Sequence, residues 1–322
     1  MDISFPIKLF ADRLTYKIFA LVPKTLAAEA VNFFVFDTIK IFLLLAVIIF
    51  TVSVIRSFLP PEKIKKILSH KNKYIGNILA ALFGIITPFC TCSAIPLFLG
   101  FIEAGVPLGV TFSFLVSSPM INEVALVLLV GMFGLKVALL YIFSGLCIAI
   151  ISGILIGQMK VEALVERIVF QQPLGNFIAG LQLSWIDRIK IARDYTFCII
   201  KQVWPYVIIG IGIGAWMHGY IPQDFLAKYA GGNKWYAVPV AVLIGIPLYS
   251  NAAGIIPLVS VLTEKGVSMG TTLAFMMAVT GLSLPEFMIL KKVMKIKLLA
   301  IFAGIVGAGI IFTGYLFNLI LK

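Results

Sequence analysis

Two stretches in the first half of this 322-residue chain place thiols, hydroxyls and prolines inside apolar runs. The first, TPFCTCSAIP, holds Cys90, Cys92 and Ser93 between Pro88 and Pro96. Thiolates bind soft ions such as Cu(I), Zn(II) or trivalent arsenic, so the cysteine pair could ligate one transiently, although two ligands do not complete a stable metal site. Free cysteine also packs as a small apolar residue, and both interpretations stay open.

The second stretch, SFLVSSPMINE, concentrates polar and helix-breaking residues: Ser117, Ser118, Pro119, Asn122 and Glu123. A carboxylate near the centre of a bilayer costs on the order of 2.5–3.5 kcal/mol, so an acidic residue at that depth is functional by default. Desolvation favours the protonated acid, which predicts that this glutamate binds and releases a proton during a transport cycle. The alternative is a carboxylate that serine and asparagine hydrogen-bond to hold a broken helix together.

Corresponding stretches, GIPLYSNAAGIIP and AVTGLSLPE, occur in the second half. They supply Ser250, Asn251, Pro257, Ser283, Pro285 and Glu286. Proline removes a backbone donor and clashes with the preceding turn, so the four stretches predict interrupted helices at membrane depth, where freed backbone groups need new partners. We expect the interruptions to converge on one site, in which the thiols, serines and asparagines bind substrate and Glu123 and Glu286 couple protons. A simple proline kink is the alternative for any single interruption.

Composition requires the elements around these stretches to be membrane helices. Hydrophobic residues make up 61% of the chain and charged residues 12%, with a mean hydropathy of +1.08, which excludes a soluble enzyme of this size. The net charge of +12 is explained by the excess of basic residues that membrane proteins carry in their cytoplasmic loops. Nucleic acid is therefore not expected as a partner. The apolar runs predict an all-α polytopic protein with segments at 33–59, 74–103, 106–131, 134–157, 195–220, 235–262, 268–290 and 298–320.

The chain carries an internal repeat. A single gap-free shift, which we call the repeat offset, aligns Pro61 with Pro222 and brings identical residues together along both halves. The matches extend beyond apolar residues, since the same offset aligns Asn72 with Asn233, Gly84 with Gly245, Pro96 with Pro257, Glu103 with Glu264 and Gly105 with Gly266. This predicts two copies of a four-segment unit, an organisation that many secondary transporters use to form a substrate site between the copies near the bilayer midplane.

Loop charges distinguish two topologies for the copies. If every segment crosses the membrane, the basic residues divide evenly between the two sides, against the positive-inside rule. If the second segment of each copy is a re-entrant hairpin, three basic stretches, at 56–73, 158–194 and 291–297, share one side of the membrane, and the copies are inverted. We prefer this arrangement. It divides the chain into an amphipathic surface segment (1–32), a first transmembrane repeat (33–157), a cytoplasmic amphipathic linker (158–194) and a second transmembrane repeat (195–322).

The block TPFCTCSAIPLFLGFIEAGVPLGVTFSFLVSSPMINE resembles the signature of the predicted-permease family that includes the organoarsenical efflux permeases of the ArsP type. The resemblance implies an eight-segment permease of the inner (cytoplasmic) membrane, and some members export trivalent organoarsenicals. It also makes thiol ligation by the two cysteines more credible. The motif positions that it marks as site candidates are Cys90, Cys92, Ser93, Pro96, Ser117, Ser118, Pro119, Asn122 and Glu123.

Three classes of function compete. The first is a secondary efflux transporter driven by protons or by the membrane potential, because the chain has no GxxxxGK[ST] loop to bind ATP and calls for no cofactor. A membrane-embedded protease or thiol enzyme is disfavoured, because both histidines, His70 and His218, lie away from the motif stretches. A passive channel or a subunit of a two-component permease stays open, as does a homo-oligomer. The expected partners are a small-molecule or metalloid substrate and the lipid bilayer.

Overall fold

The computed structural model describes residues 5–22, 25–56, 73–87, 91–121, 123–166, 184–220, 234–248, 252–291 and 293–321. Within these ranges the chain is helical apart from turns and one isolated antiparallel bridge between Val165 and Met294. Four described spans are long and apolar enough to cross a membrane, and a bent pair of helices makes a fifth. The predicted all-α polytopic membrane fold is confirmed at this level.

The helices follow the predicted segments, several of which are divided in two. In chain order they are α1 (Phe5–Asp12), η1 (Arg13–Ile18), α2 (Leu26–Arg56), α4 (Lys73–Ile86), α5 (Thr91–Glu103), α6 (Leu108–Met120), α7 (Glu123–Phe133), α8 (Leu135–Gln158), η2 (Glu162–Leu164), α10 (Trp185–Tyr220), α12 (Ala237–Gly245), α13 (Ala252–Glu264), α14 (Met269–Gly281), α15 (Leu284–Leu290) and α16 (Ile296–Ile320). η1 is a π-helical turn and η2 a 3-10 turn.

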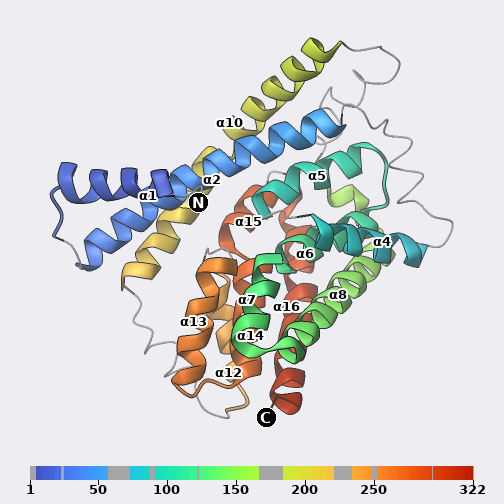
Figure 1. Ribbon diagram of the computed structural model, residues 1–322. Helices are drawn as coiled ribbons and strands as arrows, with labels where there is room; N and C mark the ends of the chain where they lie inside the picture. Colours follow the sequence, from blue (N-terminus) through green and yellow to red (C-terminus); the bar gives the residue numbers. More distant parts are fainter. Residues whose placement is uncertain are drawn as a thin grey trace.

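Helices α6 and α14 form the centre of the bundle. Every residue of α6 is buried, and so is every residue of α14 after Met269. Both helices are apolar around nearly their whole circumference, the pattern of a helix that packs against protein on all sides. α6 packs between α4 and α8, α14 packs between α12 and α16, and the two central helices contact each other. Figure 1 shows α4 toward the right of this bundle and α12 and α13 toward its lower left.

Two of the closest helix contacts lie at glycines that the repeat offset aligns. A side chain on Gly109 of α6 would overlap the backbone of Gly153 on α8. A side chain on Gly270 of α14 would overlap the backbone of Gly314 on α16 in the same way. Small residues let membrane helices approach closely, and this close packing is a main source of their association in lipid. Each central helix is therefore fixed to the last long helix of its own half.

Helix bounds and turns follow the same offset. It aligns both ends of α5 with both ends of α13, and both ends of α6 with both ends of α14. The turns that follow α5 and α13 contain Gly105 and Gly266, with φ of 74° and 83°. An L side chain is disfavoured at such positive φ, so both turns require the glycines that the aligned sequence supplies.

Helices α2 and α10 pack against each other along one side of the bundle (Figure 1). α2 contacts α5, α10 contacts α15, and α1 packs on α2. α2 begins at Leu26 and α10 at Trp185, so both helices extend into residues assigned to the surface segment and the linker. The first turns of both helices carry charged residues, so hydropathy, which detects only apolar runs, placed the starts of these segments later in the sequence.

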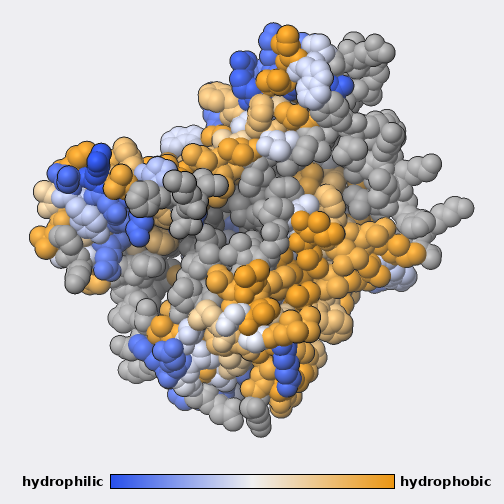
Figure 2. Space-filling model, in the orientation of Figure 1, coloured by the Kyte–Doolittle hydropathy of each residue, from blue (hydrophilic) through white to orange (hydrophobic). Residues whose placement is uncertain are grey.

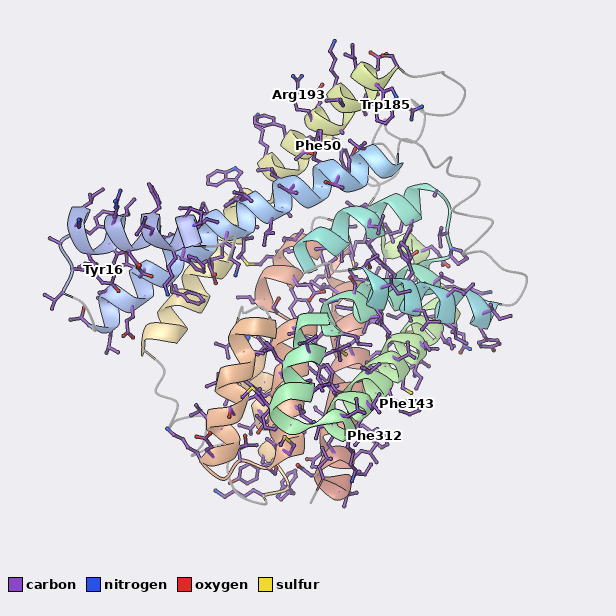
Figure 3. All side chains as sticks on the ribbon, in the orientation of Figure 1. Tyr16, Phe50, Phe143, Trp185, Arg193 and Phe312 are labelled. Atoms are coloured by element: carbon purple, nitrogen blue, oxygen red, sulfur yellow. The ribbon has the colours of Figure 1, made fainter. Side chains whose placement is uncertain are left out.

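The outer surface of the bundle is apolar along α8 and α16. Phe143 of α8 is 66% exposed and Phe312 of α16 is 70% exposed, and Figure 3 shows both on the lower right of the bundle. Figure 2 shows hydrophobic residues gathered over this face, whereas hydrophilic residues gather at the free end of α10 and around α1. An apolar face of this kind fits the hydrocarbon of a bilayer.

Candidate functional site

The interruption between α14 and α15 creates a buried polar position. α14 ends at Gly281, Leu282 leaves the helical conformation, and Ser283 occupies the N-cap position of α15 without a capping hydrogen bond from its side chain; a proline follows in the first turn. Proline is tolerated there because the first N–H groups of a helix have no partner within the helix. Ser283 is 2% exposed and Glu286, in the same first turn, is 1% exposed.

The Glu286 carboxylate lies in the protein interior without compensating donors. Neither of its oxygens accepts a hydrogen bond from a described residue. The backbone N–H of Ser283 acts favourably on the carboxylate, at a geometry too loose for a hydrogen bond. The first turn of a helix favours negative charge, which offsets part of the cost of burial. An acid in this state has a strong physical reason to take up a proton or a cationic ligand.

Backbone pairing links this interruption to the end of α12. The N–H of Leu284, at the start of α15, donates to the carbonyl of Ile246, directly after α12, at 2.8 Å. Both groups belong to helix ends and have no partner within their own helix, so each supplies what the other lacks. The residues between α12 and α13 that carry Ser250 and Asn251 lie outside the described part of the chain.

The interruption between α6 and α7 bends the chain by 49°. Tyr141 of α8 is fully buried, and its hydroxyl donates to the carbonyl of Met120, the last residue of α6, at 2.9 Å. A helix leaves its last carbonyls without backbone partners, and here the hydroxyl takes the place of a missing N–H. Ile121 follows and packs against Gly145 of α8, where any side chain would crowd it.

The two interruptions meet at the centre of the bundle. Gly281 at the end of α14 packs against Met120, so that a Cβ on this glycine would lie 3.0 Å from the Met120 Cε. The Tyr141 hydroxyl also interacts with the side chain of Thr280, one residue before Gly281. The Thr280 hydroxyl in turn donates to the Met276 carbonyl at 3.0 Å. One tyrosine therefore joins the ends of α6 and α14.

The predicted serines of α6 lie in helix packing. Ser117 and Ser118 are both buried, and the Ser117 hydroxyl donates to the Phe114 carbonyl at 3.2 Å. This hydroxyl lies against Gly84 of α4, where an added side chain would overlap it. α6 continues through Pro119, so the interruption follows this proline instead of starting at it. Ser117 thus holds α6 close to α4.

Two further prolines also lie within helices. α5 runs through Pro96 and α13 runs through Pro257, so the interruptions precede both residues. Membrane helices accommodate such prolines because neighbouring groups satisfy the freed carbonyl. Glu123 is the first residue of α7. The remaining predicted residues fall outside the described residues or side chains: Pro88, Cys90, Cys92, Ser93, Asn122, Ser250, Asn251 and Pro285.

Sequence reasoning missed Tyr141 and Thr280. A signal existed, because a tyrosine inside an apolar membrane segment needs a partner for its hydroxyl. The repeat offset aligns Tyr141 with Phe302 and Thr280 with Pro119, so neither hydroxyl has a counterpart in the other half. The contact between the two hydroxyls is therefore not repeated in the other half. A search limited to residues that the repeat offset aligns with an identical residue does not find it.

Interrupted apolar helices and a buried carboxylate are typical of polytopic membrane proteins that move solutes through their interior. The chain belongs to the predicted permease family ArsP_1, whose family model matches residues 26–319. The family resemblance seen in the block from Thr87 to Glu123 is thereby confirmed.

Individual relatives cover most of the chain. It is 25% identical over 315 residues to the UPF0718 protein MJ0584 of Methanocaldococcus jannaschii, spanning 80% of this chain and 86% of that protein. It is 28% identical over 255 residues to a Streptococcus mutans protein whose name proposes it as a subunit of a two-component membrane permease complex, spanning 78% and 82%. It is 24% identical over 262 residues to the UPF0718 protein YraQ of Escherichia coli, spanning 81% and 73%. No solved structure matches the chain.

Proposed function

We propose that this permease is a secondary efflux transporter of the inner membrane, built from two inverted copies of one four-segment unit. The common offset in sequence, helix bounds and glycine contacts supports the duplication. The second segment of each copy, α4–α5 and α12–α13, is the proposed re-entrant hairpin. The distribution of basic residues among the loops supports the inversion. The four interrupted segments are the proposed discontinuous helices of the pathway.

The coupling residues in this proposal are Glu286 and Glu123. The observation that carries it is the buried carboxylate of Glu286, which lies in the first turn of α15, directly after α14, and lacks a hydrogen-bond partner among the described residues. Protonation removes the cost of burying the charge, so proton uptake and release can accompany a change in exposure. One elementary charge moved through 100 mV provides about 2.3 kcal/mol, enough to sustain export against a gradient.

The substrate in this proposal is a small solute, with trivalent organoarsenicals as the first candidates. Cys90 and Cys92 are the proposed transient ligands of the soft ion, because thiolates bind trivalent arsenic. Polar groups at the interruptions complete the proposed site: Ser93, Ser117, Ser118, Asn122, Ser250, Asn251 and Ser283. Replacing both cysteines by serine should then abolish resistance to trivalent methylarsenical in cells. Equal resistance in the double variant would remove the cysteines from the site.

The test of coupling uses the purified chain in sealed vesicles with trivalent methylarsenical as probe, with and without a pH gradient. Glu286→Gln should abolish gradient-driven flux while leaving the amount of inserted protein unchanged. Glu264→Gln, at an exposed position on α13, is the matched control and should transport normally. Gradient-driven flux that is unchanged in Glu286→Gln would refute the coupling role of this residue.

A second candidate is a subunit of a two-component permease, which the name of the Streptococcus mutans relative favours. In that case the purified chain alone is inactive in vesicles, and activity returns when a membrane extract from the source cells is added. A passive channel instead gives flux that is independent of the pH gradient. The mass of the purified particle decides whether a homo-oligomer forms. Membership of a permease family favours any of these over an enzyme.

A further inference from the structure

A cavity of about 330 Å³ lies where the N-terminal helices pack on the first turns of α2. Its lining combines polar and aromatic side chains from three elements: Lys8, Tyr16, Glu29, Asn32, Phe33 and Phe36. Figure 3 shows Tyr16 at this junction, far from the central helix interruptions. The volume is in the range of small-molecule sites, roughly 300–1,000 Å³. The cavity is therefore separate from the proposed transport site.

The depth of the cavity corresponds to lipid headgroups. The apolar span of α2 runs over 26 residues, Leu26–Thr51, and at a rise of about 1.5 Å per residue it is longer than a hydrocarbon core of about 30 Å. Glu29 and Asn32 lie in the polar N-terminal turns of this span, so the excess length belongs at that end and these turns extend into the headgroup region. Asn32 is held in place, because its amide donates to the Asp12 carboxylate at 2.8 Å and so ties the end of α1 to α2.

Charge of both signs faces the cavity. Lys8 and Glu29 line it together, yet neither belongs to an ion pair within the described residues. An anionic ligand would satisfy the ammonium of Lys8 but would be repelled by Glu29, and a cation would have the opposite difficulty. A zwitterion satisfies both. Phe33 and Phe36 add aromatic side chains to the lining, and the Lys40 ammonium lies over the Phe36 ring at 5.3 Å from its centroid.

Exposed apolar side chains on α1 and η1, the elements that contribute Lys8 and Tyr16 to the cavity, provide a surface for acyl chains. Phe10 of α1 is 54% exposed, and Ile18 and Phe19 at the end of η1 are 72% and 55% exposed. An amphipathic segment with such residues lies in the plane of the interface with its apolar face in the upper part of the hydrocarbon. A ligand with a zwitterionic head and hydrocarbon tails therefore matches the cavity and its surroundings.

We infer that this cavity binds the headgroup of an aminophospholipid such as phosphatidylethanolamine. The phosphate pairs with the Lys8 ammonium, and the ligand's primary ammonium donates to the Glu29 carboxylate. A primary ammonium supplies three donors, whereas the quaternary ammonium of phosphatidylcholine supplies none, so the site discriminates between these two zwitterions. The bound lipid anchors α1 and η1 to the membrane end of α2.

Native mass spectrometry of the purified full chain tests this inference, with phosphatidylethanolamine, phosphatidylcholine and phosphatidylglycerol of identical acyl chains added to delipidated protein. We expect phosphatidylethanolamine to be retained about tenfold better than phosphatidylcholine, the effect of one charge-assisted hydrogen bond. Glu29→Gln should remove this preference, whereas Lys8→Ala should weaken the retention of both lipids, because both carry the phosphate that Lys8 binds. Both positions are exposed, so folding is retained, and Lys17→Ala on η1 is the matched control that keeps the preference.

Three results would overturn the inference. Equal retention of phosphatidylethanolamine and phosphatidylcholine would remove the recognition of a primary ammonium. Stronger retention of phosphatidylglycerol would make the cavity an anion site. Full displacement of the lipid by free O-phosphoethanolamine at millimolar concentration, with no contribution from the acyl chains, would assign the cavity to a soluble zwitterion.

Discussion

The hydroxyl of Tyr141 on α8 donates to the carbonyl of Met120 at 2.9 Å, at the residue where α6 ends. The same hydroxyl interacts with Thr280 at the end of α14, so one side chain spans the junction between the two halves of the chain. At the corresponding place in the second half, Phe302 carries no hydroxyl and packs against Phe112, with ring centroids 5.5 Å apart. The junction is polar on one side and aromatic on the other.

Replacing Tyr141 by phenylalanine should destabilise the protein by about 1–3 kcal/mol, because the Met120 carbonyl is left buried without a donor. Thermal unfolding in detergent measures the effect. Tyr74→Phe is the control, since Tyr74 is exposed on α4 and its hydroxyl can bond to solvent. In a double-mutant cycle with Thr280→Val the two losses should not add. Additive losses would show that the two hydroxyls act independently.

Leucine at Gly270 should prevent α14 from packing on α16, because the backbone of Gly314 occupies the space of a side chain. We expect a strong reduction in folded protein, seen as loss of the monodisperse peak in size-exclusion chromatography. Gly304→Leu, on α16, is the matched control because nothing lies within 4 Å of its Cβ position. Normal yield from Gly270→Leu would contradict the close packing of these two helices.

Replacing Glu286 by methionine should leave stability unchanged or raise it by about 1–3 kcal/mol, since an apolar side chain avoids the cost of a buried carboxyl group without donors. The measurement is the unfolding midpoint at neutral pH, with Glu264→Met as an exposed control. Combined with lost transport, this result would identify a residue retained for function at the expense of stability. A large destabilisation would instead indicate that the carboxylate holds α15 in place.

Alanine at Gly266 should cost about 1 kcal/mol, because φ is 83° and an L residue is disfavoured there. No atom lies within 4 Å of the added Cβ, so the effect isolates the backbone conformation. Gly304→Ala, inside α16, should stabilise by about 0.5–1 kcal/mol because alanine favours the helix. Opposite signs for the two substitutions in thermal unfolding are the expected result.

The sequence was sufficient for the fold class, because hydropathy acts locally and long apolar runs have few alternatives to membrane helices. The repeat offset also relates the bounds of α5 to those of α13. The sequence did not show on which side of each proline the helix is interrupted, since α5 continues through Pro96 and α6 through Pro119. Whether a membrane helix ends at a proline depends on which neighbours satisfy the freed carbonyl, and those neighbours are distant in sequence.

The candidate site could be predicted only in part from the sequence. Burial of Glu286 followed from its place in an apolar run, because an acid at that depth has few alternatives. The role of Tyr141 did not follow, since it depends on α8 passing both Met120 and Thr280. Ser117 was predicted to bind substrate from its residue type alone, and its contact with Gly84 of α4 could not be foreseen because the two residues lie on different helices.

The bond from the Leu284 N–H to the Ile246 carbonyl has a mechanical consequence. Pulling these two groups apart in an anhydrous interior would leave a donor and an acceptor bare, at a cost of several kcal/mol. The end of α12 and the start of α15 are thus tied together by this bond. In the proposed transport cycle, we expect the two ends to move together and to carry the carboxyl group of Glu286 with them.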